Sequence, residues 1–454
     1  MKAIPRRSFL KTSAVAAGTL VFPRFSIGQP GPSANSKLNV AWVGFGRGQG
    51  RRDLSACAPD NHVVALADVN QAAWARAKAE FPQAKFYKDF RVMLEEMGDS
   101  IDAVGVGTPD HTHFAVAYMA MSMGKHVFVQ KPLTHTLWEA RTLQALAKEK
   151  NVVTQMGNQG HASEGARLIK EWYEAGLIGE VKEVITWTNR PQKGAGFTGR
   201  VQTAFPAAAE APKGLDWDLW LGPCNKEIGY NPMFHPMKWR AWWDFGCGGL
   251  GDIGCHTIDT AYWAMGLGAP DRVDVEMNNP VNSIFTPNGS VVSYQFPARG
   301  KKPPVTLKWY EGPTPPVLPA GYDQEMQEGG GFIMVGEKGG ICHHGMRPDS
   351  PRLYPEDKWQ DYRANPDERV AKTLPRTKGI YKDWLAAIKN GTQACSDFSY
   401  AAPLTETILL GTFAIRTGQS VSWNASDMTI RDNEEAAKLI KTETRKGWRI
   451  EDLA

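Results

Sequence analysis

The sequence predicts an α/β protein of two domains, an N-terminal doubly wound parallel sheet followed by an α/β domain with an open, largely antiparallel sheet. Its 454 residues exceed what one hydrophobic core usually organises. Short apolar runs alternate with helix-length segments as far as residue 156. The later apolar runs no longer alternate regularly with helices. We therefore expect a leader and tether over residues 1–36, a first domain over 37–156 and a second over 157–454.

The first 36 residues are typical of an export signal. Arg6 and Arg7 precede an apolar stretch over residues 12–22, which is too short to cross a bilayer core of about 30 Å. Paired arginines before such a stretch resemble a twin-arginine signal, although Pro5 stands where Ser or Thr is more usual. A tether rich in Gly, Pro and Ser follows. This predicts a periplasmic or otherwise exported protein; the alternative is a basic tail on a cytoplasmic protein.

The charge of the chain gives no argument for nucleic-acid binding. Residues 1–28 carry five basic side chains and no acidic one, so removing them from the total of +4 leaves −1. Beyond the leader, no membrane segment is expected. None of the six cysteines forms a Cys-x-x-Cys motif, so no structural zinc is predicted.

The first domain is predicted element by element from its apolar runs. Residues 38–43 lead into a glycine-rich turn and suit a first buried parallel strand. Further strands are expected over residues 62–67, 101–107, 126–129 and 152–156. Between these strands, one helix is expected to begin near residue 51, and two others are expected over residues 71–81 and 138–149. A further helix is expected to end at residue 123.

The second domain has a helical pattern over residues 164–175, an extended run over 181–189 and an irregular segment over 191–230. Strands of an antiparallel or mixed sheet are predicted over 272–277, 290–296 and 306–310. Two late helices, over residues 381–390 and 405–418, are expected to pack on this second domain.

The turn after the first strand indicates a dinucleotide site. Gly44-x-Gly46 stands between a strand and a helix, where the backbone can approach a pyrophosphate. The third glycine of the fingerprint is expected at position 49, which is Gln, with Gly48 and Gly50 on either side. Asp68 ends the next strand and is placed to bind ribose hydroxyls, which favours NAD over NADP.

Three later residues fit the oxidation of an alcohol. Lys131 follows a strand at the carboxyl edge of the sheet, and Pro132 fixes its backbone. Asp252 and His256 are four residues apart, so they share a helix face, where the carboxylate is expected to orient the imidazole as a proton shuttle. Hydride leaves a carbinol carbon only as its hydroxyl loses a proton, which needs a base and a nearby positive charge. A helix-internal ion pair and a metal site are the alternatives, although no further ligand motif supports a metal, and none is predicted.

These motifs together resemble one known family. Gly105-Val-Gly-Thr-Pro-Asp-His-Thr-His113, Gln130-Lys131-Pro132 and Gly251-Asp252-x-Gly254-x-His256-x-x-Asp259 are similar to motifs of the Gfo/Idh/MocA oxidoreductases, from about residue 38 to the C-terminus. The resemblance implies a Rossmann domain, a C-terminal α/β domain that often forms homo-oligomers, and Lys131, Asp252 and His256 as catalytic residues, with His256 as base. The expected NAD-binding residues are Gly44, Phe45, Gly46, Arg47, Asp68, Thr108, Pro109, His113 and Lys131. The family triplet is usually Glu-Lys-Pro, and Gln130 departs from it.

Aromatic and charged residues indicate a carbohydrate substrate. Trp239, Arg240 and Trp243 precede Asp252, and tryptophan faces stack on sugar rings; the alternative is that they pack a core. His161 is a further candidate for substrate contact. We therefore expect an NAD-dependent oxidoreductase acting on a sugar, glycoside or polyol hydroxyl. The alternative is an NAD-dependent glycosidase that oxidises its substrate transiently, eliminates the glycosidic bond and reduces the product. A non-catalytic sugar-binding protein fits the catalytic residues poorly.

Overall fold

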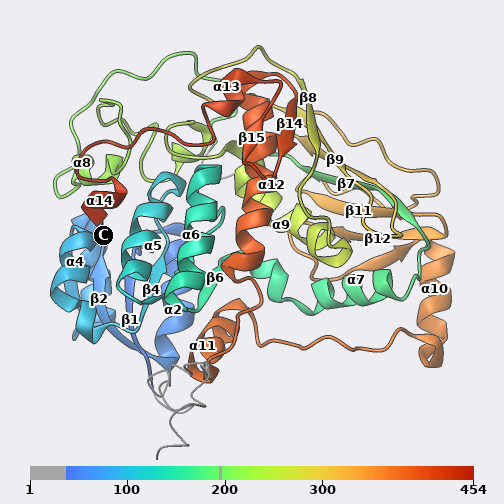
Figure 1. Cartoon of the computed structure of the whole chain (residues 1–454), viewed down its shortest axis with the longest axis horizontal. Helices are drawn as coiled ribbons and strands as arrows, with labels where there is room; N and C mark the ends of the chain where they lie inside the picture. The colour runs from blue at the N-terminus through green and yellow to red at the C-terminus, as the bar shows by residue number, and fades with distance from the viewer. Residues whose placement is uncertain (1–36, 194–196, 454) are drawn as a thin grey trace, which may run out of the picture.

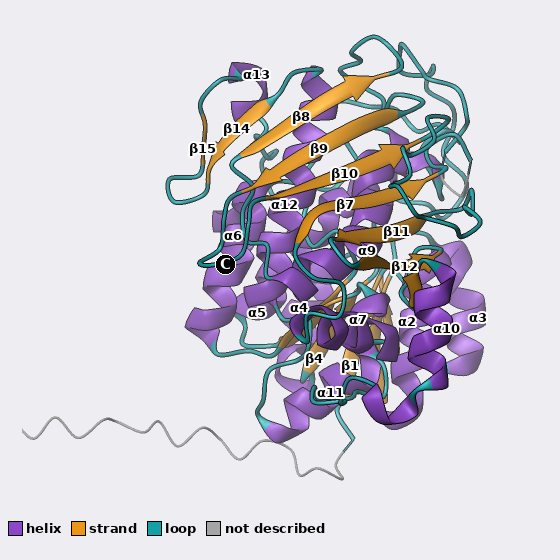
Figure 2. Cartoon of the chain, turned by 90° about the vertical axis from the view of Figure 1, so that its right-hand side faces the viewer, coloured by secondary structure: helices purple, strands orange, loops and turns teal. Residues whose placement is uncertain are grey.

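A computed structural model of the chain describes residues 37–193 and 197–453. The predicted export signal and tether, residues 1–36, lie outside the described residues. The described chain forms two sheets, one in each half, with helices around the first and on one side of the second (Figures 1 and 2).

The first sheet has the predicted doubly wound architecture, with six parallel strands in the order β3-β2-β1-β4-β5-β6. The strands are β1 (Asn39–Val43), β2 (His62–Ala67), β3 (Lys85–Tyr87), β4 (Ala103–Val106), β5 (His126–Val129) and β6 (Thr154–Met156). Sequence reasoning missed β3, because three residues show no periodicity. The carboxyl ends of all six strands meet at one edge, which carries the glycine turn, Asp68, Thr108 and Lys131.

Alternate residues of these strands face two helical layers. Val40 and Trp42 of β1 pack on one side, and Ala41 and Val43 on the other. Gly105 of β4 leaves room for the Trp42 ring, because a Cβ there would lie 2.2 Å from it. One layer holds α2 (Gly48–Cys57) and α3 (Trp74–Glu80), and the other holds α4 (Phe90–Met97), α5 (His113–Ser122) and α6 (Leu137–Lys150).

The second sheet is mixed and mostly antiparallel, as predicted. Its nine strands run in the order β13-β12-β11-β7-β10-β9-β8-β14-β15, and only β7 and β10 pair in parallel. They are β7 (Val181–Thr188), β8 (Arg272–Met277), β9 (Ser290–Phe296), β10 (Val305–Glu311), β11 (Gly331–Gly336), β12 (Gly339–His344), β13 (Arg352–Tyr354), β14 (Val421–Asn424) and β15 (Thr429–Ile430).

The helices of the second half separate this sheet from the first domain (Figure 1). α7 (Glu164–Glu174), α9 (Gly248–Met265) and α12 (Phe398–Thr417) pack in the core beneath the sheet. α12 is long and apolar enough to cross a membrane, but most of it is buried against α6 and α9, as in a core helix. Apart from α11, which is described next, the other α-helices of the described residues are α8 (Trp217–Leu221), α10 (Glu356–Ala364), α13 (Glu434–Ala437) and α14 (Ile450–Leu453).

One late helix does not pack where the sequence suggested. α11 (Ile380–Asn390) was expected on the second domain, but it contacts α2 and closes one face of the parallel sheet. Its Ile380, Trp384 and Ile388 share a core cluster with Val40 and Trp42. Amphipathic spacing predicts that such a helix exists, but it does not say which apolar face it covers.

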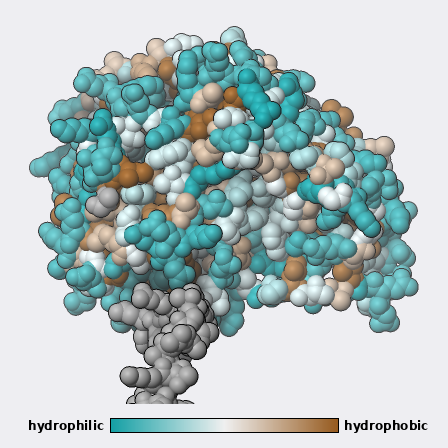
Figure 3. All heavy atoms as spheres, in the orientation of Figure 1, coloured by the Kyte–Doolittle hydropathy of each residue, from teal (hydrophilic) through white to brown (hydrophobic). Residues whose placement is uncertain are grey.

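The face of the molecule seen in Figure 3 is mostly hydrophilic, with small apolar areas scattered over it.

Candidate active site

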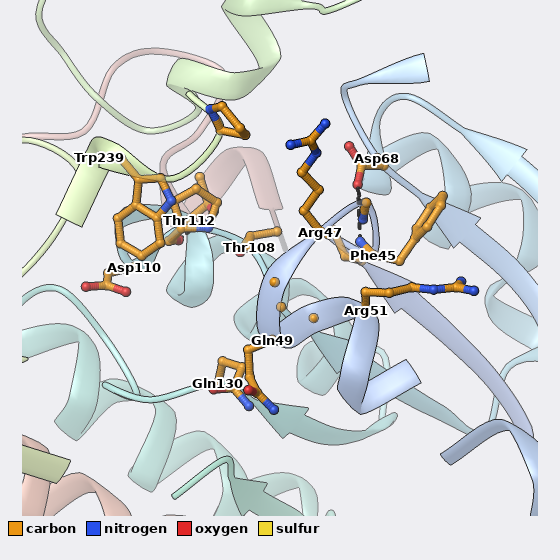
Figure 4. A pocket seen from close by; sticks show the side chains of 18 of the residues that line it. Phe45, Arg47, Gln49, Arg51, Asp68, Thr108, Asp110, Thr112, Gln130 and Trp239 are labelled. Carbon is orange, nitrogen blue, oxygen red and sulfur yellow. Dashed lines mark hydrogen bonds between the residues drawn. The ribbon is translucent and has the colours of Figure 1, made fainter. Parts of the chain in front are cut away.

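A cavity of about 590 Å³ lies between the carboxyl edge of the parallel sheet and helix α9. The glycine turn, Asp68, Thr108 and Lys131 line it from the first domain. Trp239, Arg240, Asp252 and His256 line it from the second. Figure 4 shows Arg47 and Asp68 in one part of this cavity, and Trp239 and Asp110 in another.

The glycines of the turn are required by close backbone contacts. Gly44 has a φ of +76°, and a Cβ there would lie 2.8 Å from the Gly107 carbonyl carbon. A Cβ on Gly50 would lie 2.1 Å from the Gly44 oxygen and 2.8 Å from the Gly107 oxygen. The close-packing glycine is thus Gly50, one residue later than the sequence fingerprint suggested.

The beginning of α2 is a ready anion site. Arg47 precedes the helix without any side-chain cap, and the first turn holds no acidic residue, so the N–H groups of that turn are available to a phosphate. Thr108 Oγ1 is buried beside the turn without a hydrogen-bond partner among the described residues. A pyrophosphate would satisfy these donors, so the site fits a dinucleotide.

Asp68 orders the turn that it faces. One carboxylate oxygen accepts hydrogen bonds from the amides of Phe45, at 3.2 Å, and Gly46, at 2.8 Å; the other accepts from Asn70, at 2.9 Å. Burial raises the pKa of Asp68 to about 6, so the carboxylate is mostly ionised at neutral pH. Because an ionised oxygen has more than one lone pair, it retains capacity for ribose hydroxyls and disfavours a 2′-phosphate.

Lys131 and Asp252 meet across the two domains. Lys131 Nζ donates to Asp252 Oδ1 at 2.8 Å and also to the Asp252 backbone oxygen. Arg190 donates to Asp252 Oδ2, and Arg240 Nε lies 3.4 Å from Oδ1. Although burial opposes ionisation, the three cations hold the pKa of Asp252 far below its usual value. The Asp252 carboxylate thus holds the ammonium group of Lys131 in place.

His256 lines the same cavity one helical turn after Asp252. Burial, together with Lys131 and Arg347, lowers the pKa of His256 well below 6.5, so the ring is neutral at physiological pH. The structure shows no hydrogen bond between Asp252 and His256, and His256 Nδ1 has no partner among the described residues. The carboxylate therefore acts on Lys131 rather than orienting the imidazole, contrary to our expectation from their spacing.

The departure at Gln130 has a structural counterpart in Asp53 of α2. Gln130 Nε2 donates to Asp53 Oδ2 at 2.7 Å, while Gln49 Nε2, at 2.7 Å, and Tyr381 Oη, at 2.6 Å, donate to Oδ1. Burial raises the pKa of Asp53 to about 6. Gln49 and Gln130, which donate to the same carboxylate, are both labelled in Figure 4. A carboxylate from the neighbouring helix thus lies against the side chain of Gln130, the residue that precedes Lys131.

Not every predicted contact residue reaches the cavity. Trp239 and Arg240 line it, with the guanidinium 4.3 Å from the Trp239 ring centroid, but Trp243 does not, because its ring is buried in the core and its indole donates to Asn282. His161 also lies outside the lining; its ring is buried with Asp259, Tyr400 and Trp263.

One further predicted assignment, that of His113, is refined by the structure. His113 lines the cavity, but its ring nitrogens contact the backbone oxygens of Pro132 and Thr108, so it holds those two loops. The described residues contain no cluster of three or more His, Cys, Asp or Glu side chains able to hold a metal ion.

The structure adds three residues that sequence reasoning missed. Asp110 lines the cavity, accepts from the Cys247 amide at 3.2 Å, and has its pKa raised to about 7 by burial. It lies inside a quoted motif, so its position was a usable signal. Arg190 and Arg347 also line the cavity. Both come from irregular segments, where no periodicity could have marked them.

Comparisons with known proteins agree with this geometry. Residues 38–158 match the family described as "Oxidoreductase family, NAD-binding Rossmann fold", and residues 169–286 match "Oxidoreductase family, C-terminal alpha/beta domain". Together the two matches cover just over half of the chain.

Among relatives, the uncharacterized oxidoreductase YdgJ of Escherichia coli is 23% identical over 84% of this chain and 96% of its own length. Levoglucosan dehydrogenase of Pseudarthrobacter phenanthrenivorans is 26% identical over 56% of this chain, but the match spans only 52% of that protein. Among solved structures, WlbA dehydrogenase from Bordetella pertussis, in complex with NADH and UDP-GlcNAcA, has a TM-score of 0.60 at 16% identity, over 87% of this chain and 99% of that one. At such identity this likeness shows the shared fold.

Proposed function

Because the chain belongs to the Gfo/Idh/MocA family of NAD-binding oxidoreductases, we propose that it transfers hydride between NAD and a hydroxyl-bearing carbon of a sugar, glycoside or polyol. The observation that carries the proposal is the convergence of Lys131 and His256, from two domains, on the cavity that begins at the glycine turn. Relatives named levoglucosan dehydrogenase and scyllo-inositol 2-dehydrogenase act on substrates of this class.

The bound nicotinamide supplies the hydride acceptor, and the side chains handle the proton. A neutral His256 can take the hydroxyl proton as hydride leaves the same carbon. Lys131 uses two of its three N–H donors on Asp252, so one remains for the developing alkoxide. Asp252 keeps the ammonium group in place, and Trp239 borders the space for the sugar.

One observation favours a second candidate, the redox-neutral glycosidase. An elimination next to a transient ketone needs another group that exchanges a proton near neutral pH, and Asp110 is such a group, with its pKa raised to about 7.

We further propose that the protein is exported through its twin-arginine segment with NAD bound and acts as a homo-oligomer.

The test is incubation of the purified full chain with free sugars and aryl glycosides, with NADH and products followed together. A keto-sugar formed with NADH supports the dehydrogenase, whereas aglycone release without net NADH supports the glycosidase. Lys131→Ala and His256→Ala are each expected to lower turnover by roughly 10²- to 10⁴-fold while NADH remains bound. Wild-type turnover in either variant would refute the assigned roles.

A further inference from the structure

The catalytic end of the cavity holds more positive than negative charge. Lys131, Arg190, Arg240 and Arg347 line it together with only two carboxyl groups, Asp252 and Asp110. Asp252 already contacts Lys131, Arg190 and Arg240, so one carboxylate serves three cations. Burial raises the pKa of Asp110 to about 7, so it is only partly ionised at neutral pH. The side chains that line this end of the cavity therefore carry a net positive charge.

Arg347 is the cation of this set that forms no salt bridge among the described residues, although it lies near enough to Asp53 to lower the pKa of that carboxyl. It lies between β12 and β13, and its Nη2 donates to the neutral amide of Gln159 at 3.1 Å. Its Nε is buried without a hydrogen-bond partner, and no carboxylate of the described residues forms a salt bridge with it. Its charge contributes to the lowered pKa of His256, so the guanidinium lies near the imidazole. Buried N–H donors on a charged group are costly to leave unpaired.

We propose that the substrate is an anionic carbohydrate, a hexuronic acid or its glycoside, whose carboxylate is bound by Arg347 while a ring hydroxyl faces His256. This inference rests on the proposed function and narrows it to one substrate class. A planar guanidinium matches a carboxylate through paired hydrogen bonds, and the partly exposed Arg190 can approach the same group. The anionic substrate would also balance the charge at this end of the cavity.

The experiment uses the full chain loaded with NADH or NAD and matched pairs of ligands. Methyl glucuronides are compared with methyl glucosides, and methyl galacturonides with methyl galactosides; sugar phosphates and sulfates form a separate arm. Binding is measured by the change in NADH fluorescence, and turnover by product formation. We expect kcat/KM for the uronate of at least one pair to exceed that for its neutral partner by roughly 10- to 100-fold.

Arg347→Gln is expected to reduce this preference to within about threefold, and Arg347→Lys to restore part of it, because lysine keeps the charge but lacks the paired donors. Arg431→Gln, at an exposed position, serves as the control and should keep the wild-type ratio. NADH affinity is measured for each variant, which also reports on folding.

Several results would overturn the inference. They are equal or faster turnover of the neutral sugar in every pair, a preference for phosphate or sulfate over carboxylate, and a loss of NADH affinity in Arg347→Gln, which would assign Arg347 to the cofactor. If no sugar is turned over, the proposed function fails, but a fluorescence response to uronates alone still supports the anion site. No response to either member of any pair would refute both.

Discussion

Replacing Gln130 by glutamate tests the polar cluster that Gln49, Gln130 and Tyr381 form around Asp53, next to Lys131 in the chain. The substitution restores the Glu-Lys-Pro triplet that is usual in the family, yet we expect it to destabilise this protein. The new carboxylate would meet Asp53 Oδ2, to which Gln130 now donates at 2.7 Å. Two buried carboxylates at this distance cannot both be ionised, so one must hold a proton.

The expected magnitude follows from the wild-type cluster. The pKa of Asp53 is already raised from 3.8 to about 6, which corresponds to about 3 kcal/mol of stability lost above pH 6. Gln130→Glu removes one charge-assisted hydrogen bond, worth about 1.5–3 kcal/mol. Since the folded-state pKa of the pair rises further, we expect a total loss of about 3–5 kcal/mol at pH 8, and about 1 kcal/mol at pH 5, where the pair carries its proton.

The assay is urea unfolding at pH 8 and pH 5, followed by tryptophan fluorescence. The double variant Gln130→Glu with Asp53→Asn should recover most of the loss, because the asparagine amide can donate to the new carboxylate while its oxygen still accepts from Tyr381 and Gln49. Gln83→Glu, at an exposed position, is the matched control. Wild-type stability of the single variant at pH 8, or no recovery in the double variant, would contradict this reasoning.

Three further predictions concern the glycine turn and the residues proposed to exchange protons. Gly50→Ala should abolish NADH binding measured by fluorescence titration, because its Cβ would lie 2.1 Å from the Gly44 oxygen. Gly329→Ala is the control and should bind NADH normally, because a Cβ there meets nothing within 4 Å. Tight NADH binding by the Gly50 variant would disprove the packing role of Gly50. The pH profile of kcat/KM should show no loss from His256 protonation between pH 8 and 6, because the His256 pKa lies well below 6.5 and the base form persists as pH falls. If Asp110 exchanges a proton during turnover, an inflection near pH 7 should disappear in Asp110→Asn; its persistence would exclude that role.

The sequence predicted what local patterns control. Apolar runs placed β1, β2, β4, β5 and β6 to within a few residues, because buried parallel strands need continuous apolar side chains. The spacing of Asp252 and His256 placed both on α9 and on the cavity wall.

What it could not predict depends on contacts distant in the chain. Gly50 is identified as the packing glycine by the shape of the turn, which brings the Gly44 oxygen against it, and by the Gly107 backbone, 57 positions later. Trp239 and Trp243 look alike in sequence, but only the first borders the cavity. Asp252 pairs with Lys131 and Arg190 instead of His256, because two other segments bring their charges to it.

The position of α11 also bears on how the protein is synthesised. Helix α11 covers apolar side chains of β1, yet more than 300 residues separate the two in the chain. During translation, the nascent nucleotide-binding half therefore exposes an apolar surface until Ile388 has been synthesised. A fragment ending near residue 158 should aggregate or need a chaperone, and truncations before residue 390 should impair folding of the amino-terminal half as well as the carboxyl-terminal one.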